Sequence, residues 1–475
     1  MTNIVVYDLE TSGIDAAFSS ILQAAAICVD ENLNEIDRFN FRGRMKSYYP
    51  IPHPKALLVN HVEVDQLKND NNSNFSLISQ IQTKFKSWNE CIFIGYNSIG
   101  FDEHHLRQSF YQSCLPPYLT NTEGNKRADA LKIVHAASAS NPNKFVRPIS
   151  DETGKTTFQL VKFAEANSIP HTKAHDAMSD VETTLDVLKL IQDRCPDVWE
   201  FSKQTASKQD VYTLIDQDKI FCASRFFRGK EYTHGLVYLT KNPLYQNHVY
   251  CFDLKFDPEM VFGLDRGELK KLFKGKDKCF HLVKANEHPI LLDEKYLLES
   301  EEYKNIDPEL IYKRMGIIRS NKNFIEKFNN LLIDMQEEKN LTQDQSEKFV
   351  EKQIYDGFPD NKDNYLMQEF HAAKSEDKFA IAEKISDHRY KEFAKRVMFN
   401  EFPDFLPKKE LIQRNKVVAE NHLTLESRPW CTIPQATQAI DDLREEDKEV
   451  DLDRLEEIDS FIMEMKEKFE RDLNN

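Results

Sequence analysis

The chain has little glycine, scattered cysteines and no long apolar run, and each shortage excludes a class of protein. Glycine occurs only 13 times in 475 residues, so long flexible linkers are not expected. The 8 cysteines include no Cys-x-x-Cys pair, which argues against a disulfide framework and against a structural zinc site. No apolar run approaches the roughly 18 residues of a membrane span, and the N-terminus lacks the features of a secretory signal. We therefore expect a cytoplasmic protein without a membrane anchor.

The chain is acidic, with a formal net charge of −16. Taken alone, this charge counts against a nucleic-acid partner, because surfaces that bind phosphates are usually basic. Binding is local, however, and carboxylates that hold metal ions add negative charge where an enzyme needs it. The length and the mixture of 40% apolar with 30% charged residues indicate a globular protein of about three domains.

The first part of the chain has the pattern of an α/β domain, which we place at residues 1–196. Three apolar or alternating segments joined by short turns predict an antiparallel meander of strands at 3–7, 23–29 and 36–42. Further along, we expect a helix over 75–88, a buried strand over 91–97, a helix that begins at Asp102 and another that begins at Arg127.

The pattern of apolar and polar residues changes twice in the remaining sequence. Short apolar and aromatic runs separated by turn residues predict a small β-barrel with a helical extension over 197–348. These runs are Lys219–Ala223, Gly235–Leu239, His248–Leu254, Cys279–Val283 and Pro289–Leu292. Residues 349–475 are almost free of glycine and have helical periodicity, which predicts an all-α C-terminal domain.

Four acids and one histidine stand at the predicted strand ends and helix starts of the first domain. Asp8 and Glu10 end the first strand, where residues i and i+2 point to the same face. Asp102, His175 and Asp180 lie near helix starts, so an acid that complements the helix dipole, a helix cap and a surface acid are structural alternatives. Oxygen ligands without a thiolate favour Mg²⁺ or Mn²⁺. Two such ions about 3.5–4 Å apart catalyse phosphodiester hydrolysis, and an imidazole suits the base that activates water.

Three motifs resemble those of the DEDDh exonuclease superfamily, which has a ribonuclease H-like fold and degrades nucleic acid from the 3′ end. They are Asp8-x-Glu10-Thr11, Gly95-Tyr96-Asn97 with Phe101-Asp102, and His175-Asp-Ala-Met-Ser-Asp180. The stretches 95–103, 167–178 and 354–358, together with the length, resemble the bacterial exodeoxyribonuclease I family. That resemblance implies a Src-homology-3-like barrel and a helical domain that close over the nuclease domain to form a channel for single-stranded DNA.

The resemblance also implies a role for each residue of the set. Asp8 would bridge two Mg²⁺ ions, with Mn²⁺ as an alternative, and Glu10 and Asp180 would hold the ion that activates water. Asp102 would support the second ion, and His175 would be the general base. The residues expected to bind substrate are Leu9, Thr11, Tyr96, Asn97, Phe101, Arg127, Arg225 and Lys230.

Some positions depart from the family pattern, and these departures concern individual DNA contacts. Ala128 stands where the family often has an aromatic residue, Gln159 where it often has a basic one, and residues 397–405 lack the expected arginines. The family further implies that the acidic C-terminal tail of single-stranded DNA-binding protein docks on the enzyme, for which Lys230 and Arg319 are candidates.

The sequence therefore predicts a monomeric, metal-dependent 3′→5′ exonuclease that releases nucleoside 5′-monophosphates from single-stranded DNA, in DNA repair and recombination. One alternative is a DEDDh enzyme that acts on RNA, although such enzymes are usually about one domain long. The other is a catalytically inactive exonuclease fold that serves as a binding module, although inactive copies usually lose an acid or the histidine.

Overall fold

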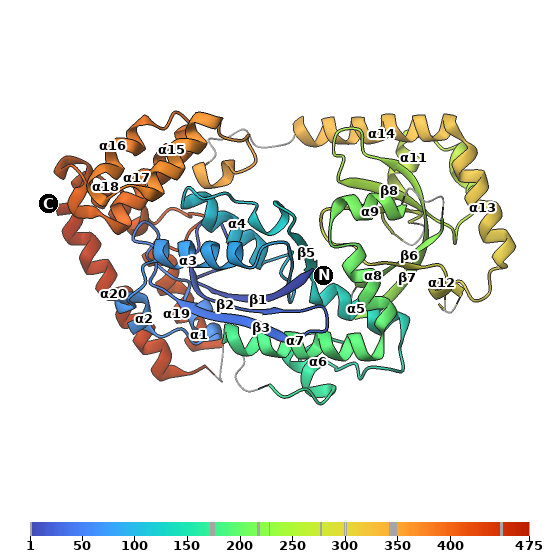
Figure 1. The fold of residues 1–475 in the computed structure, drawn as a ribbon, viewed down its shortest axis with the longest axis horizontal. Helices are drawn as coiled ribbons and strands as arrows, with labels where there is room; N and C mark the ends of the chain where they lie inside the picture. Colours follow the sequence, from blue (N-terminus) through green and yellow to red (C-terminus); the bar gives the residue numbers. More distant parts are fainter. Residues whose placement is uncertain are drawn as a thin grey trace.

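The computed structural model describes residues 2–171, 176–215, 219–227, 229–275, 278–298, 300, 302–341, 349–446 and 450–474. Figure 1 shows a central sheet, a second sheet to one side of it and a group of C-terminal helices on the other side. No helix in the described ranges combines the length and the apolar character needed to cross a membrane. All the cysteines are free, and all but Cys431 are buried.

The central sheet has the strand order β3-β2-β1-β4-β5. Its strands are β1 (Asn3–Thr11), β2 (Ile21–Val29), β3 (Glu35–Arg42), β4 (Cys91–Gly95) and β5 (Lys126–Asp129). Strands β1, β2 and β3 pair antiparallel, which confirms the predicted meander. Strands β1, β4 and β5 run parallel, so their carboxyl ends lie at one edge of the sheet.

The prediction that a helix begins at Arg127 is wrong, because this residue belongs to β5. The strand is short and carries no apolar run, so its own sequence gives no strand signal. It forms by pairing with β4, with Gly95 opposite Asp129. The helix α5 begins at Ala130, directly after the strand, and the Asp129 carboxylate caps it by accepting the backbone N–H of Leu131 at 3.0 Å.

Helices cover both faces of the central sheet (Figure 1). The helices of this part are α1 (Pro54–Asn60), α2 (Val64–Asn69), α3 (Asn74–Ser87), α4 (Asp102–Gln112), α5 (Ala130–Ser140), α6 (Leu160–Ala166), α7 (Ala177–Arg194) and α8 (Pro196–Gln204), with a 3-10 turn at Leu119–Asn121. The next helix, α9 (Lys208–Ile215), packs against the second sheet. Ile4 and Val6 of β1 pack in one core with α5 and α7. Val5, Tyr7 and Leu9 pack in a second core with α3 and α4. The alternation along β1 therefore assigns its even-numbered side chains to the α7 face.

The second sheet is antiparallel, with the order β10-β6-β7-β8-β9, and its strands match the predicted runs. Its strands are β6 (Phe221–Phe227), β7 (Lys230–Lys241), β8 (His248–Asp253), β9 (Phe280–Lys284) and β10 (Leu291–Asp293). The accompanying helices are α10 (Glu259–Phe262), α11 (Arg266–Lys271), α12 (Lys295–Leu298), α13 (Pro308–Ser320) and α14 (Lys322–Leu341). Phe324 and Phe328 of α14 pack against Phe280 of β9, so the helical extension covers this sheet.

The C-terminal part is helical, as predicted, and it packs against the first part. Its elements are η2 (Val350–Gln353), α15 (Asn361–Ala372), α16 (Ser375–Lys384), α17 (His388–Glu401), η3 (Pro403–Phe405), α18 (Lys408–Leu423), α19 (Ile433–Glu446) and α20 (Leu452–Asn474). Tyr111 of α4 stacks edge-on against Phe393 of α17. The fully buried Glu351 carboxylate pairs with Arg396 and accepts the hydroxyl of Tyr49. An ion pair on the C-terminal side thus contacts the first part of the chain.

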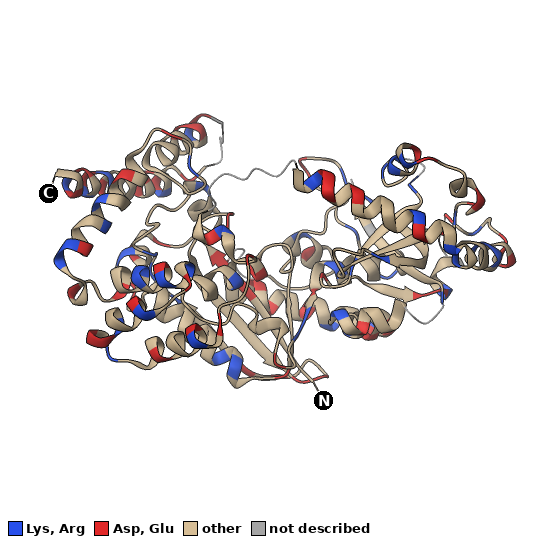
Figure 2. Ribbon diagram, turned by 90° about the horizontal axis from the view of Figure 1, so that it is seen from above, with Lys and Arg blue, Asp and Glu red and all other residues tan. Residues whose placement is uncertain are grey.

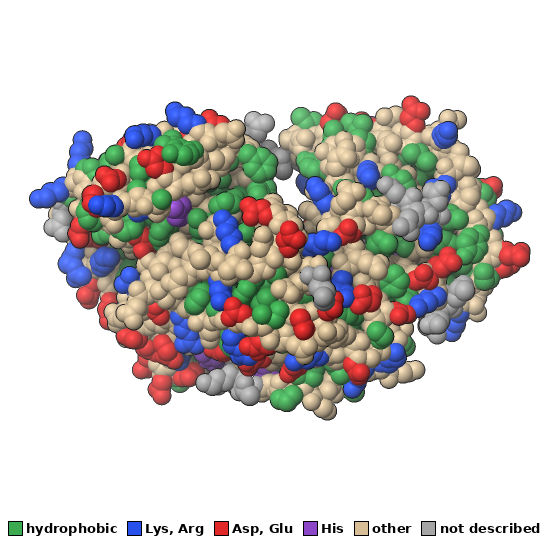
Figure 3. All heavy atoms as spheres, viewed as in Figure 1, with side chains coloured by type: hydrophobic (Ala, Val, Ile, Leu, Met, Phe, Trp, Pro, Cys, Tyr) green, Lys and Arg blue, Asp and Glu red, His purple; other side chains and the backbone are tan. Residues whose placement is uncertain are grey.

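The charged residues are distributed over the whole molecule. Figure 2 shows Lys and Arg interspersed with Asp and Glu along the outer helices at both ends. The space-filling view in Figure 3 shows a notch at the upper edge, between the C-terminal helices and the part that carries α14. The acidic surplus is therefore not confined to one end.

Candidate active site

Asp8 and Glu10 lie at the carboxyl end of β1, on the face that α7 covers. They share this face with Ile4 and Val6, because side chains alternate along a strand. Asp8 pairs across the sheet with Ala25, and Glu10 pairs with Gln23. Glu10 is only 9% exposed. The sequence thus places two carboxylates at the edge of a core.

Asp180 comes to the same place from the first turn of α7. The N-cap of this helix is Asp176, a residue type that is favoured at this position, and its carboxylate accepts the backbone N–H of Ser179 at 3.3 Å. The same carboxylate accepts a hydrogen bond from Gln23 of β2 at 3.1 Å and pairs with Arg42 of β3 at 3.0 Å. The start of α7 is therefore fixed to the sheet that carries Asp8 and Glu10.

The carboxylates of Asp8, Glu10 and Asp180 form a compact group, with oxygen atoms within 4.8 Å of one another. Burial and the charges of Asp180, Asp102 and Asp176 raise the pKa of Glu10 to about 9. Burial and the neighbouring carboxylates also raise the pKa of Asp8 well above its ordinary value. Such crowding is unfavourable for bare carboxylates and suits a divalent cation, because hard oxygen donors are the ligands that Mg²⁺ and Mn²⁺ prefer.

Asp102 stands beside this group without belonging to it. Its carboxylate is 4% exposed, and burial raises its pKa even though backbone N–H groups of Asp102 and Leu9 donate hydrogen bonds to it. Its charge contributes to the raised pKa of both Asp8 and Glu10, so the carboxylate is electrostatically part of the site. The structure therefore brings together the four predicted acids.

The predicted base, His175, lies outside the described residues. A second imidazole, that of His171, lies close to the acids. Its Nε2 is 3.6 Å from Oδ1 of Asp180, and its Nδ1 is 2.7 Å from the hydroxyl of Thr183. Sequence reasoning gave His171 no role, although it stands nine residues before Asp180 in the same stretch.

The loop after β4 carries three of the predicted substrate residues. Gly95 cannot be replaced without movement, because a Cβ atom there would lie 2.6 Å from Cβ of Ser98 and 2.8 Å from the carbonyl oxygen of Tyr7. Asn97 has a φ of 62°, a left-handed conformation that asparagine tolerates. The carboxylate of Asp129 accepts the backbone N–H groups of Asn97 at 3.1 Å and Ile99 at 3.2 Å. The carboxylate of Asp129, at the end of β5, therefore holds the backbone of this loop in place.

The predicted substrate residues of the first part differ in exposure. Asn97 is exposed, whereas Tyr96 donates its hydroxyl hydrogen bond to the carbonyl of Phe158. Phe101 lines a cavity of about 830 Å³ between the end of β1 and the C-terminal part. Thr11 is 6% exposed, and Leu9 is 5% exposed in the core opposite the acids.

The three predicted basic contacts lie farther along the chain. Arg127 is engaged within the protein, since it pairs with Glu103 at 3.0 Å and donates to the carbonyl of Asn286 at 3.2 Å. Lys230 is exposed at the start of β7. Arg225 lies in β6, opposite Tyr232 of β7, and its side chain is outside the described part.

Two buried polar residues that sequence reasoning missed hold this framework together. Glu103 is 2% exposed and accepts hydrogen bonds from Tyr7 at 2.8 Å, Thr120 at 2.8 Å and Arg127 at 3.0 Å. His288 accepts the backbone N–H of Asp129 at 3.0 Å and so connects the second sheet with the end of β5. The position of Glu103 directly after Asp102 in a motif could have indicated a role for Glu103. His288 stands outside any motif, so the sequence gives no such indication for it.

Comparison with protein families finds a match in each part of the chain. A family model described as "Exonuclease" matches residues 5–188. The exonuclease I SH3-like domain matches residues 206–333, and the exonuclease I C-terminal domain matches residues 348–465.

Curated relatives align over most of their length. The exodeoxyribonuclease I of Buchnera aphidicola subsp. Schizaphis graminum is 28% identical over 420 residues, which cover 86% of this chain and 85% of the relative. The exodeoxyribonuclease I of Escherichia coli strain K12 is 26% identical over 387 residues, which cover 77% of this chain and 78% of the relative.

Solved structures share the whole fold. Exonuclease I of Methylocaldum szegediense has a TM-score of 0.83 at 20% identity, with 98% of this chain and 100% of that chain covered. E. coli exonuclease I in complex with a dA16 oligonucleotide has a TM-score of 0.82 at 22% identity and the same coverage. A structure of SSB/exonuclease I in complex with the inhibitor CFAM has a TM-score of 0.79 at 23% identity, again with 98% and 100% covered.

Proposed function

We propose, because the chain belongs to the exonuclease I family, that it hydrolyses single-stranded DNA from the 3′ end and releases nucleoside 5′-monophosphates. The family is one of metal-dependent exonucleases. The observation that carries the proposal is the carboxylate group of Asp8, Glu10 and Asp180 at the end of the central sheet. The exonuclease match over residues 5–188 and the two exonuclease I matches over 206–333 and 348–465 support this proposal for most of the chain.

The residues present fit a metal site, and we assign it to Mg²⁺, with Mn²⁺ as the alternative. Asp8 would bridge two ions, Glu10 and Asp180 would hold one of them, and Asp102 would support the other. The donors are carboxylate oxygens only, which suits these hard cations. When bound, the ions supply an activated water and stabilise the charge that develops on the phosphate.

The chain's own residues position the substrate and move the proton. The loop held by Asp129 would present Tyr96, Asn97 and Phe101 to the terminal nucleotide, with Leu9 and Thr11 beside it. His175 would take the proton from the attacking water, and the bond to the 3′ oxygen of the preceding nucleotide would break. Lys230, Arg225 and Arg127 would contact the strand farther from the acids.

The deciding experiment follows the shortening of 5′-labelled substrates in Mg²⁺. Single-stranded DNA, duplex DNA and RNA are each incubated with the wild-type protein, with Asp180→Ala and with Asp186→Ala. Asp186 lies on the same helix and pairs with Lys189 at the surface, so it is a matched control. We expect stepwise shortening of single-stranded DNA by the wild type and the control, and none by Asp180→Ala or with chelator.

Each alternative function has its own outcome in this experiment. Equal shortening of RNA would replace the DNA assignment with an exoribonuclease. Binding of single-stranded DNA without any cleavage in Mg²⁺ or Mn²⁺ would indicate an inactive binding module. Undiminished activity of Asp180→Ala would overturn the assignment of the acids. His175→Ala is expected to retain DNA binding and lose most of its turnover.

We further propose single-stranded DNA-binding protein as a partner, docked through its acidic C-terminal tail. The support is the solved SSB/exonuclease I structure, together with the exposed Lys230 and the basic Arg319 in the last turn of α13. A labelled peptide with the tail sequence should bind the wild type and bind Lys230→Glu and Arg319→Glu more weakly. Equal binding by both variants would exclude these two contacts.

The remaining assignments are a monomer in the cytoplasm with domains at 1–196, 197–348 and 349–475, acting in DNA repair and recombination. The two sheets and the C-terminal helices support a division into three segments, and α8 (Pro196–Gln204) crosses the proposed boundary between residues 196 and 197. Sedimentation of the purified chain tests the monomer. Limited proteolysis tests the boundary near residue 348, where cleavage should concentrate, whereas the buried Val198 and Trp199 of α8 should protect the boundary near residue 197.

A further inference from the structure

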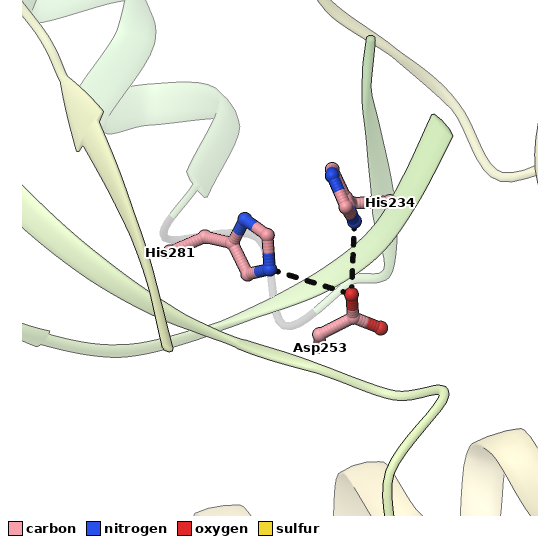
Figure 4. A group of neighbouring side chains, drawn as sticks. All are labelled: His234, Asp253 and His281. Atoms are coloured by element: carbon pink, nitrogen blue, oxygen red, sulfur yellow. Dashed lines mark hydrogen bonds and ion pairs between the residues drawn. The ribbon is translucent and has the colours of Figure 1, made fainter. Parts of the chain in front are cut away.

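A second group of ionisable side chains lies in the second sheet, on neighbouring strands. His234 is on β7, Asp253 ends β8 and His281 is on β9 (Figure 4). The three residues are far apart in the sequence, and the pairing of β8 with both neighbours brings them together. They belong to no part of the nuclease site described above.

One carboxylate oxygen of Asp253 faces both imidazoles. Nδ1 of His234 is 2.9 Å from Oδ2, and Nε2 of His281 is 3.4 Å from the same oxygen (Figure 4). One potential ligand atom from each residue lies within 4.8 Å of the others. In a tetrahedral zinc complex, ligands about 2.0–2.1 Å from the ion lie roughly 3.3–3.4 Å apart. The two separations that involve Oδ2, 2.9 and 3.4 Å, are each within about 0.5 Å of that spacing, and the two imidazole nitrogens lie within 4.8 Å of each other.

The other oxygen of Asp253 is held by separate partners. Oδ1 accepts the hydroxyl of Tyr303 and the backbone N–H of Lys255, the latter at 2.9 Å. Tyr303 in turn accepts the backbone N–H of Gly235 at 2.9 Å. These contacts fix the carboxylate so that Oδ2 faces the two histidines, as partners of metal ligands commonly do.

The group is buried on one side and open on the other. Asp253 and His281 are each 2% exposed, whereas 21% of the His234 side chain is exposed. All three residues line a cleft of about 1280 Å³, which gives an ion and a water molecule a path to the group. A zinc site with three protein ligands keeps its fourth coordination position open for a water molecule, and the cleft provides that opening here.

The geometry points to a transition-metal site formed by His234, Asp253 and His281, which takes Zn²⁺ with water in the fourth position. Two imidazoles and one carboxylate suit Zn²⁺ and similar ions, whereas the carboxylates of the nuclease site suit Mg²⁺ or Mn²⁺. The sequence argument against structural zinc concerned thiolate ligands, and this donor set contains none. A bound ion would cross-link three strands of the sheet, and this inference does not depend on the proposed nuclease activity.

The test measures Zn²⁺ affinity in full-length protein that carries Asp180→Ala, which disables the carboxylate site. Zinc is titrated against a fluorescent chelator in excess Mg²⁺, which competes for the remaining carboxylates. We expect one Zn²⁺ per chain. Tyr303→Phe should weaken binding about 10-fold, and His234→Ala or His281→Ala should weaken it by more than about 100-fold. His248→Ala, on the same sheet and outside the group, should leave the affinity unchanged.

The choice of variant and a second metal ion keep the test decisive. His234 is partly exposed, so His234→Ala tests the site even if the buried His281 cannot be replaced without unfolding. Co²⁺ in place of Zn²⁺ should give the visible absorption of a tetrahedral site in the wild type and lose it in His234→Ala. Absence of Zn²⁺ binding, or equal binding by His234→Ala, would overturn the proposal and leave a hydrogen-bonded His–Asp–His group that holds the strands through protons.

Discussion

The crowding of carboxylates in the nuclease site predicts that the protein loses stability as pH rises when divalent cations are removed. Burial and the neighbouring carboxylates raise the pKa of Glu10 to about 9 in the folded chain, whereas the pKa of a glutamate in the unfolded chain is near 4.5. Between these values the folded chain binds the additional proton. The free energy of unfolding therefore falls by about 1.4 kcal/mol per pH unit for each such proton, or about 3 kcal/mol between pH 6 and pH 8. A bound cation replaces the proton, so this loss should disappear in Mg²⁺.

The assay is thermal unfolding at pH 6, 7 and 8 in chelator and in Mg²⁺. For a domain of about 150–250 residues, 3 kcal/mol corresponds to roughly 6–12 °C in Tm. Glu10→Gln removes the titrating group, so its Tm in chelator should fall less steeply with pH and exceed that of the wild type at pH 8. Glu165→Gln, an exposed position of α6, is the control. Equal slopes for the wild type and Glu10→Gln would refute the reasoning.

Three further substitutions test the supports of the site. Asp176→Ala removes the cap of α7 and should lower the free energy of unfolding by about 1 kcal/mol in urea denaturation; an unchanged midpoint would show that the cap contributes nothing. Gly95→Ala should destabilise the protein by about 1–3 kcal/mol and reduce nuclease activity, because the new methyl group has no space; wild-type Tm and activity would contradict the crowding. Glu351→Gln removes one of the two carboxylates that pair with Arg396, while Glu392 remains at 2.7 Å, and should lower the free energy of unfolding by about 1–3 kcal/mol; an unchanged Tm would show that this ion pair is dispensable.

The parts of the fold that could be predicted are those whose signal is local. Alternation along a strand placed Asp8 and Glu10 on one face, and helical periodicity located the start of a helix at Asp102. The apolar runs of the second sheet were also sufficient to locate its strands. In each case a few neighbouring residues carry enough information, because side-chain alternation and apolar periodicity are properties of the element's own sequence.

The parts that could not be predicted depend on contacts between distant residues. Strand β5 exists because β4 lies beside it, and its four residues carry no pattern of their own. Glu103 gains its importance from Tyr7, Thr120 and Arg127, which only the assembled sheet and helices bring together. The group of His234, Asp253 and His281 likewise follows from the register of three strands.

The alternation along β1 has a consequence for how this protein can vary. Ile4 and Val6 belong to the same face as Asp8 and Glu10, while Val5, Tyr7 and Leu9 belong to the other. Inserting or deleting one residue within the strand would exchange the two faces and place both carboxylates in an apolar core. Within β1, the spacing of the packing residues and of the acids can therefore change only together.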